Sequence, residues 1–348
     1  MRTLFRTALA LTLAAGLSAA DKPRISILAT GGTIAGSAAS ATTTVGYKAG
    51  ALGIESLLQA VPALKDVAQV SGEQIFKISS SDMTTAHWLK LAKRVNEVLA
   101  KPEVDGVVIT HGTDTLEETA YFLDLVVHSD KPVVLVGSMR PATALSADGP
   151  MNLFDGVRLA GSPEAKGKGV LVLLNDTIHS AREVTKTNTM LPDTFKAPEL
   201  GALGYMTQDR AHFYRASTRR HTKASEFDVD QLQTLPKVDI VYSYASADGV
   251  AVDAFTAAGS QGLIYAGTGD GSVPEAVKPS LLSARKKGVA VVRSSRTGNG
   301  HTNELEDDVK DGFATSDSLN PQKARVLLML ALTKTRDPRE IQKFFEVY

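Results

Sequence analysis

The stretch Ile25-Ser-Ile-Leu-Ala-Thr-Gly-Gly-Thr-Ile-Ala-Gly36 decides the fold. Its apolar run, residues 25–29, predicts a buried strand, because turn residues follow a short continuous hydrophobic segment. Two adjacent glycines, at positions 31 and 32, permit a sharp turn and a close approach of backbone. They leave the hydroxyl group of Thr33 at the carboxyl end of the strand. Ligands of open α/β sheets bind at that edge, so Thr33 is the first candidate for a chemical role.

Two nucleotide-binding motifs are similar to this turn, and both fail. Gly31 and Gly36 have the G-x-x-x-x-G spacing of a phosphate loop, but Ser37-Ala38 follows where Lys-Ser/Thr is required. The dinucleotide pattern G-x-G-x-x-G fails because Thr33 occupies the place of its second glycine. On this stretch alone, a turn without chemistry stays open as the alternative.

Composition excludes several classes of protein. A chain of 348 residues favours two domains. Lys and Arg number 38, as do Asp and Glu, so no basic surface for nucleic acid is expected. The absence of cysteine excludes disulfides, a thiol nucleophile and cysteine-rich zinc sites. The seven histidines show no metal-ligand spacing, so we expect neither a metal nor another cofactor.

The first 20 residues have the pattern of a secretory signal peptide. Arg2 and Arg6 precede the apolar run 9–17, and Ser18-Ala-Ala20 supplies small residues before a cleavage site. We expect cleavage after Ala20 and a periplasmic or secreted protein. The run is too short to anchor the mature chain in a bilayer. A buried N-terminal helix is the alternative.

Strands alternate with helices along most of the chain, which predicts mainly parallel sheets. Predicted strands cover residues 25–29, 74–78, 106–110, 133–136 and 169–174, and the rhythm resumes at 238. We therefore expect an α/β protein of two domains, each a mainly parallel sheet flanked by helices. The larger N-terminal catalytic domain spans 21–212, a polar linker spans 213–236, and the smaller C-terminal domain spans 237–348.

A second strand end repeats the arrangement of the first. Residues 106–110 are followed by His111-Gly-Thr-Asp-Thr115, so Thr113 also lies just past a predicted parallel strand. A threonine hydroxyl is a poor nucleophile until a base takes its proton. Candidates for that base are Asp114, Tyr47 and Lys186. A lysine acts as a base only where burial or a second cation lowers its pKa.

Each candidate also has a purely structural interpretation. Asp114 fits the start of the helix that begins at Thr115, where Thr115 and Glu118 form a predicted capping box. Lys186 fits a surface charge, and Tyr47 fits a loop residue packed on the core. The chain lacks the G-x-S-x-G motif of serine hydrolases.

Two long motifs together resemble the signature pair of bacterial type II L-asparaginases, the glutaminase-asparaginase group. They are residues 29–36 and Ile109-Thr-His-Gly-Thr-Asp-Thr-Leu-Glu-Glu-Thr-Ala120. The likeness covers the whole mature chain. It includes Val136-Gly-Ser-Met-Arg-Pro141, Ser146-Ala-Asp-Gly-Pro150, Asn175-Asp-Thr177, Thr185-Lys-Thr-Asn-Thr189, Val292-Arg-Ser-Ser295 and Asn320-Pro-Gln-Lys-Ala-Arg325.

The resemblance implies an amidohydrolase that converts free L-asparagine, and L-glutamine, to the acid and ammonia without a cofactor. It implies that Thr33 is the nucleophile and that Tyr47 is the tyrosine of the loop behind it. It further implies that Thr113, Asp114 and Lys186 form a second catalytic group. Which group deprotonates Thr33, and whether attack is covalent or by water directly, stays open.

The resemblance also implies a substrate-binding set of Ser80, Ser81, Thr113 and Asp114. A carboxylate that accepts from the substrate ammonium makes a strong charge-assisted hydrogen bond. Ser81 departs from the family, which usually carries Gln or Glu there. Ser246 departs where some relatives carry Asn, in a region that in the family reaches a neighbouring subunit. The family implies a homotetramer built as a dimer of dimers, and the asparagine-to-glutamine preference stays open.

A different class of protein competes with this interpretation. A periplasmic amino-acid-binding module would have the same two-domain α/β architecture and would bind without chemistry. Two strand ends that each carry a threonine favour the enzyme, because simple binding requires no activated hydroxyl group.

Overall fold

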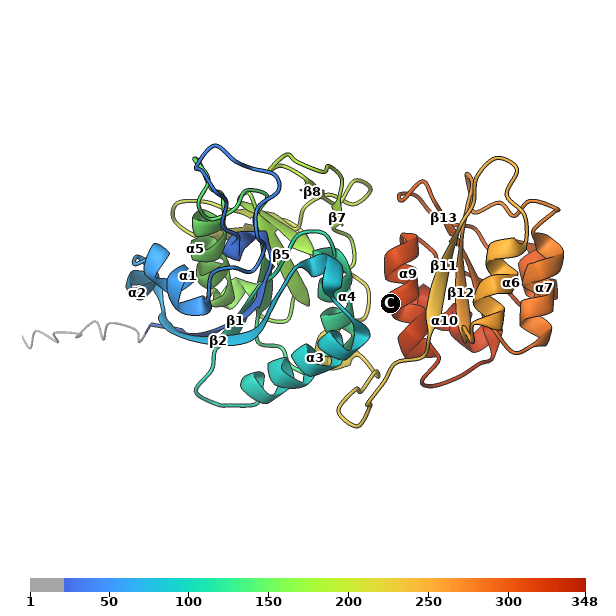
Figure 1. Cartoon of the computed structure of the whole chain (residues 1–348). Helices are drawn as coiled ribbons and strands as arrows, with labels where there is room; N and C mark the ends of the chain where they lie inside the picture. Colours follow the sequence, from blue (N-terminus) through green and yellow to red (C-terminus); the bar gives the residue numbers. More distant parts are fainter. Residues whose placement is uncertain (1–21) are drawn as a thin grey trace, which may run out of the picture.

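The computed structural model describes residues 22–348, and the predicted signal peptide lies outside them. Two α/β domains lie side by side, with helix α9 between their sheets (Figure 1). The predicted fold class, a larger N-terminal and a smaller C-terminal domain, is confirmed. Among the described residues, no helix has the length and apolar character needed to cross a membrane.

The N-terminal sheet has eight strands in the order β10-β9-β6-β5-β4-β3-β1-β2. Strands β1 to β5 are mutually parallel, whereas β6, β9 and β10 pair antiparallel at one side. The strands are β1 (Arg24–Gly31), β2 (Gln69–Ile78), β3 (Gly106–Thr110), β4 (Val133–Val136), β5 (Val170–Leu174), β6 (Thr177–Ser180), β9 (Gly204–Met206) and β10 (Ala211–Phe213). The predicted strand 74–78 is too short, because residues 69–73, which lack a continuous apolar run, also pair with β1 through backbone hydrogen bonds.

Helices cover both faces of this sheet, as alternating side chains of buried parallel strands require. Helices α3 (Thr85–Leu99) and α4 (Leu116–Val126) share one apolar core with one face of the strands. Helices α1 (Ile54–Ala60), α2 (Leu64–Val67) and α5 (Gly149–Ala160) share a second core with the other face. Trp88, in α3, is buried and stacks on Phe122 of α4.

The C-terminal sheet is parallel, in the order β11-β12-β13-β14. Helices α6 and α7 pack on one face with their own core, and α9 lies on the other face. The elements are β11 (Val238–Tyr242), α6 (Val250–Ala257), β12 (Gly262–Gly267), α7 (Lys278–Lys286), β13 (Ala290–Ser295), α8 (Glu306–Asp311), β14 (Ala314–Thr315), α9 (Pro321–Ala331) and α10 (Pro338–Val347).

The two domains share a continuous apolar core. Leu116 and Ala120 of α4 belong to the same buried cluster as Ala324 and Leu327 of α9. Burial of apolar surface is the dominant favourable contribution to folding, so the contact between α4 and α9 holds one domain against the other. A separate ribbon, β7 (Thr185–Lys186) paired antiparallel with β8 (Phe195–Lys196), belongs to neither large sheet.

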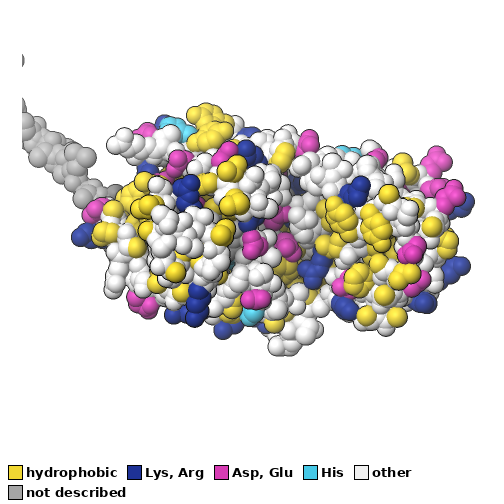
Figure 2. Space-filling model, turned by 45° about the horizontal axis from the view of Figure 1, so that its top comes forward, with side chains coloured by type: hydrophobic (Ala, Val, Ile, Leu, Met, Phe, Trp, Pro, Cys, Tyr) yellow, Lys and Arg dark blue, Asp and Glu magenta, His cyan; other side chains and the backbone are white. Residues whose placement is uncertain are grey.

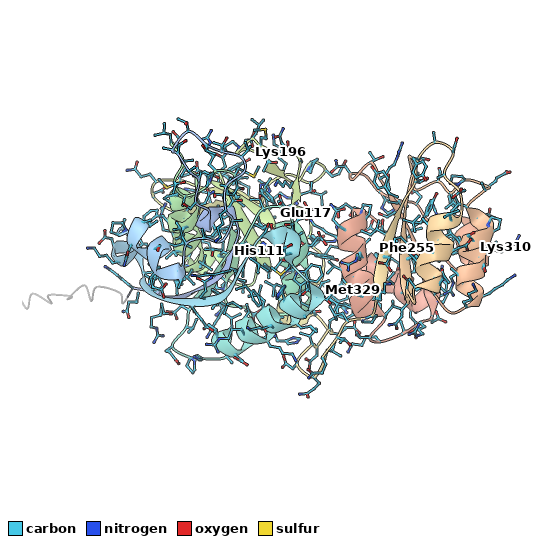
Figure 3. All side chains as sticks on the ribbon, in the orientation of Figure 1. His111, Glu117, Lys196, Phe255, Lys310 and Met329 are labelled. Atoms are coloured by element: carbon cyan, nitrogen blue, oxygen red, sulfur yellow. The ribbon has the colours of Figure 1, made fainter. Side chains whose placement is uncertain are left out.

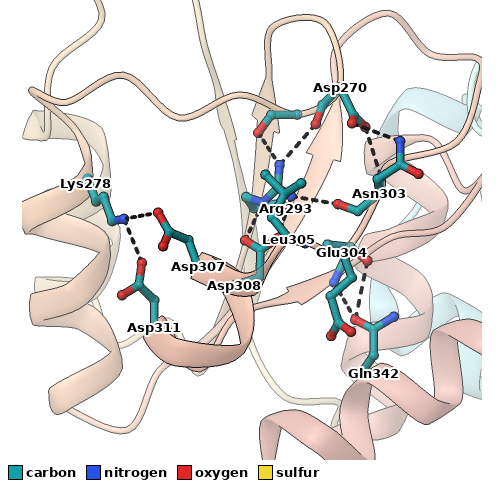
Figure 4. Close-up of polar contacts among 12 residues, drawn as sticks. Asp270, Lys278, Arg293, Asn303, Glu304, Leu305, Asp307, Asp308, Asp311 and Gln342 are labelled. Atoms are coloured by element: carbon teal, nitrogen blue, oxygen red, sulfur yellow. Dashed lines mark hydrogen bonds and ion pairs between the residues drawn. The ribbon is translucent and has the colours of Figure 1, made fainter.

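A buried ion pair ties the loops of the C-terminal domain to its sheet (Figure 4). Arg293, in β13, forms two parallel bonds with Asp308 of α8, Nε to Oδ1 and Nη2 to Oδ2, each 2.6 Å long. Its remaining donors reach the carbonyl oxygens of Asp270 and Gly271 at 3.0 Å and of Asn303 at 2.8 Å. One guanidinium group therefore connects a strand, a helix and two loops.

We predict that Arg293→Met destabilises the protein by about 3–5 kcal/mol, because it leaves the Asp308 carboxylate buried without a positive charge beside it, with the Leu305 backbone N–H as its remaining donor. The matched control is Arg339→Ala, which removes a half-exposed partner of Glu304. We expect it to change stability by less than about 1 kcal/mol. Chemical denaturation at one fixed protein concentration measures both. Equal losses in the two variants would contradict the importance of the buried pair.

Candidate active site

Two turns meet at the carboxyl edge of the N-terminal sheet. Strands β1 and β3 are parallel neighbours, so the turns that follow them lie next to each other. Gly32 has φ of +78°, and a Cβ atom there would lie 2.3 Å from the Cα atom of Gly112. The backbone of the two turns is therefore in contact, and no residue larger than glycine fits at position 32.

The hydroxyl group of Thr33, in the first turn, forms a hydrogen bond with a tyrosine. Thr33 begins the short helix η1 (Thr33–Ala35) and is 7% exposed. Its Oγ1 atom lies 2.7 Å from the hydroxyl oxygen of Tyr47, and either group can donate. Residues 37 and 48 form a two-way backbone bridge with both hydrogen bonds 3.0 Å long, which closes the base of the intervening loop. This closure places Tyr47, near the end of the loop, beside Thr33, in the turn that precedes the loop.

The hydroxyl group of Thr113, in the second turn, accepts a hydrogen bond from a lysine. Lys186 Nζ donates to Thr113 Oγ1 at 3.0 Å and pairs with Asp114 Oδ1 at 2.6 Å. Thr113 is buried and Lys186 is largely buried, whereas the Asp114 side chain is 61% exposed. The structure thus brings together three side chains that the resemblance had grouped, and one carboxylate of the group faces solvent.

Ser80 joins this network from the far side of β1. It begins η2 (Ser80–Asp82), directly after β2, and its Oγ atom accepts from the Asp114 backbone N–H at 3.1 Å. Its carbonyl oxygen accepts from Thr115 Oγ1 at 2.8 Å. The predicted capping box is therefore wrong, because the Thr115 hydroxyl group bonds Ser80 and makes no capping bond to α4.

Ser81 and Ser246 have different surroundings. Ser81 is exposed, and its hydroxyl group lies 2.8 Å from that of Ser79; within residues 22–348 this is its only side-chain hydrogen bond. Ser246 follows β11 in the C-terminal domain with φ of +66°, a conformation that costs a residue with a Cβ atom about 1–2 kcal/mol. The structure thus places neither side chain in the hydrogen-bond network described above.

An open groove lies beside Lys186. It is lined by Asp114, Glu117, Glu118, Lys186, residues 187–189 and Gln322. Burial raises the pKa of the Glu118 carboxyl group to about 7. Burial lowers the pKa of His111, at the end of β3, to about 4, so this imidazole is neutral at pH 7.

Sequence reasoning missed one polar group at this site. Glu117 is buried in α4 and accepts a hydrogen bond from the Lys186 backbone N–H at 2.6 Å. Glu117 stands beside Glu118 in the first turn of α4, where acidic residues are common, so the sequence carries no signal of its burial. In the described part of the chain, no three His, Cys, Asp or Glu side chains gather closely enough to hold a metal ion.

The fold and the two paired hydroxyl groups are those of an amidohydrolase built from two α/β domains. Residues 24–219 match the family model described as asparaginase, N-terminal, and residues 237–345 match the glutaminase/asparaginase C-terminal domain. The chain belongs to the asparaginase family, of the bacterial type II kind, which confirms the resemblance drawn from its two motifs.

Similar proteins cover nearly the whole chain. L-asparaginase 2 of Bacillus subtilis is 57% identical over 94% of this chain and 87% of its own. L-asparaginase 2 of Escherichia coli is 51% identical over 99% of both chains. The crystal structure of a probable cytoplasmic L-asparaginase from Campylobacter jejuni has a TM-score of 0.92 and 52% identity, covering 94% of this chain and all of that one. Other relatives are named glutaminase-asparaginase (Pseudomonas fluorescens) and probable periplasmic L-asparaginase (Haemophilus influenzae).

We predict that Gly32→Ala lowers stability by about 2–5 kcal/mol. The new methyl group costs about 1–2 kcal/mol in a left-handed conformation and about 1–3 kcal/mol through its clash with the Gly112 backbone. Gly167→Ala is the matched control, because Gly167 has φ of +70° and no atom within 4 Å of the added carbon. Thermal unfolding followed by circular dichroism compares them. A Gly32 variant as stable as the control would show that the two turns are not in tight contact.

Proposed function

We propose that this protein hydrolyses the side-chain amide of free L-asparagine, and also that of L-glutamine, to the corresponding acid and ammonia. The observation that carries the proposal is the double contact of Lys186 with Thr113 and Asp114, beside the Thr33–Tyr47 pair. The names L-asparaginase 2 and glutaminase-asparaginase among its relatives support the choice of substrate.

In the mechanism we propose, Thr33 Oγ1 attacks the amide carbon of the substrate. The Tyr47 hydroxyl group is in hydrogen-bond contact with that oxygen and relays a proton: it accepts the proton of Thr33 and passes its own phenolic proton to the departing amide nitrogen. The new C–O bond converts the carbonyl oxygen to an oxyanion. The Thr113 hydroxyl group and backbone N–H groups of the glycine turns stabilise that oxyanion, each donor contributing a few kcal/mol. Protonation of the nitrogen releases ammonia, and water then hydrolyses the ester at Thr33.

Thr113, Lys186 and Asp114 act as the second catalytic group in this proposal. The Lys186 ammonium group contacts both the Thr113 hydroxyl group and the Asp114 carboxylate. It therefore links Thr113, the proposed oxyanion donor, to Asp114, which binds the substrate ammonium group in this proposal.

The ends of a zwitterionic amino acid find complementary groups here. The exposed carboxylate of Asp114 accepts from the substrate ammonium group, and the Ser80 hydroxyl group and neighbouring N–H groups donate to its α-carboxylate. Ser81 belongs to the proposed binding set only as a neighbour, because its hydroxyl group turns to Ser79.

We also propose export and assembly. The signal-like residues 1–20 and the relative named periplasmic support export, although the Campylobacter protein is named cytoplasmic.

Hydrophobic side chains gather on the surface of the C-terminal domain (Figure 2), and large exposed patches mark interaction sites. They support a homotetramer. The large hydrophobic side chains that are exposed in the C-terminal domain are those of Tyr242, Tyr244, Val250, Leu305 and Val309. We propose the domain limits 21–212, 213–236 and 237–348; strand β10 ends at Phe213, one residue into the proposed linker, and β11 begins at Val238.

Release of ammonia tests the proposal against a binding module. The purified protein is incubated with asparagine, glutamine and a peptide that contains asparagine, and ammonia is assayed in each case. We expect release from the free amino acids and little from the peptide, because Asp114 and Ser80 bind free α groups. Binding of asparagine without ammonia would instead support an amino-acid-binding module.

We predict that Thr33→Ala and Thr113→Val each lower kcat by at least about 1000-fold, since groups that act as a catalytic unit are each indispensable. Thr256→Val, in α6 of the other domain, is the control and should keep normal turnover. Circular dichroism verifies that all three variants are folded. Near-normal turnover by either site variant would remove that threonine from the mechanism.

We predict that Ser80→Ala raises KM for asparagine about 10-fold, which corresponds to the loss of one hydrogen bond of 1–2 kcal/mol. Ser81→Ala should change KM by less than about twofold, because its hydroxyl group bonds Ser79. Steady-state kinetics on asparagine separates the two serines. The reverse order of effects would mean that Ser81, and not Ser80, contacts the substrate.

A further inference from the structure

Glu117 and the polar residues that open α9 take no part in the mechanism above, although they are joined to Lys186. Glu117 lies on α4, beside the C-terminal domain (Figure 3). Its Oε2 atom accepts from the Lys186 backbone N–H at 2.6 Å. Its Oε1 atom accepts from Asn320 Nδ2 at 3.0 Å and from Gln322 Nε2 at 2.7 Å. One buried carboxylate therefore connects the lysine to the other domain.

The same end of α9 also holds the chain just before Lys186. The Lys323 side chain is 2% exposed, and its ammonium group donates to the carbonyl oxygen of Arg182 at 2.8 Å and to that of Val184. Asn320 caps α9, with Oδ1 accepting from the Lys323 backbone N–H at 3.1 Å. The backbone that leads into Lys186 is thus fixed at three points, all supported by α9.

Because the charged groups of Glu117 and Lys323 are buried, each of them requires partners at defined positions. A charged group taken out of water is costly unless it is paired and hydrogen-bonded, and Glu117 meets that condition with three N–H donors. Burial lowers the pKa of Lys323 to about 8, and the negative charge of Glu117 opposes that change. The two charges stabilise each other inside the contact between the domains.

Lys186 depends on these contacts because its own strand is minimal. β7 contains two residues and, in the described part of the chain, pairs only with the two residues of β8. An isolated two-stranded ribbon is marginally stable. The position of the Lys186 ammonium group, 3.0 Å from Thr113 Oγ1, therefore requires support from outside the ribbon.

We propose that Glu117 is a positioning residue for Lys186, and that Asn320 and Gln322 of the C-terminal domain hold the Glu117 carboxylate in place. The inference rests on the proposed function of Lys186. It assigns to the C-terminal domain a part in setting the geometry of a site whose reacting groups all lie in the N-terminal domain.

Glu117→Gln tests the proposal with little change of shape. A glutamine offers one acceptor oxygen where the carboxylate offers two, so its NH₂ group must face either the Lys186 N–H or the amide donors of α9. Asn320 cannot rotate to relieve the conflict without losing its cap on α9. We expect kcat for asparagine to fall about 10- to 100-fold, the effect of a small misplacement of a catalytic group, with KM changed by less than about twofold.

Asp124→Asn is the matched control. It changes the other buried carboxyl group of α4, which accepts from the Val170 backbone N–H at 2.7 Å outside the groove, and should leave kcat within about twofold of normal. Gln322→Leu supplies a second variant from the other domain. It should lower kcat, and the double variant Glu117→Gln with Gln322→Leu should be no slower than Glu117→Gln alone, because the two residues act through one contact.

The outcomes separate this proposal from the proposed function. Lys186→Met, assayed alongside, should lose nearly all turnover; if it stays active, the role of Lys186 itself is wrong. If Lys186→Met is inactive while Glu117→Gln keeps normal kcat, only the positioning role fails. It also fails if Glu117→Gln raises KM without lowering kcat, or if the effects of Glu117→Gln and Gln322→Leu on kcat multiply.

Discussion

The contact between the glycine turns that follow β1 and β3 is the constraint on which the site depends. Parallel pairing of the two strands brings their carboxyl ends to one edge, but side chains at the turns would hold them apart. With glycine at 32 and 112, the backbones touch, and Ser80 from the end of β2 reaches the same point. The hydroxyl groups of Thr33 and Thr113 are consequently set by rigid strands on both sides, which preorganises them at little cost in entropy.

A second constraint comes from charge. Lys186 reaches Thr113 from a short ribbon outside the large sheet, so neither strand pairing nor an apolar core fixes it directly. Carboxylates surround it instead: Asp114 pairs with its side chain and Glu117 holds its backbone. The two carboxylates differ in exposure, because Asp114 faces solvent and Glu117 is buried. The exposed one is available to a substrate ammonium group, and the buried one is committed to internal hydrogen bonds.

The sequence predicted the parts of the site that lie directly on strand ends. Thr33, Thr113 and Asp114 follow buried apolar runs, so their place at the sheet edge follows from topology alone. Lys186 was one of three candidate bases, but the residues alone did not determine which hydroxyl group it contacts, since no periodicity relates a two-residue ribbon to a distant strand. Glu117 escaped notice because a helix pattern identifies its apolar stripe, whereas the partners of a buried carboxylate come from another domain. The capping box failed for a related reason: a tertiary contact with Ser80 replaced the local bond.

The contact between α4 and α9 couples the position of the C-terminal domain to the geometry of this site. Apolar residues of both helices share one core, and at the end nearest Lys186 that core gives way to Glu117, Asn320, Gln322 and Lys323. Apolar packing is tolerant of small shifts, but a carboxylate with three N–H donors is directional, so the polar end fixes the register that the apolar part leaves loose. A shift of α9 along α4 would break these hydrogen bonds before it exposed much apolar surface. The geometry around Lys186 is therefore sensitive to the seating of the whole C-terminal domain, although the groups proposed to react with substrate belong to the other one.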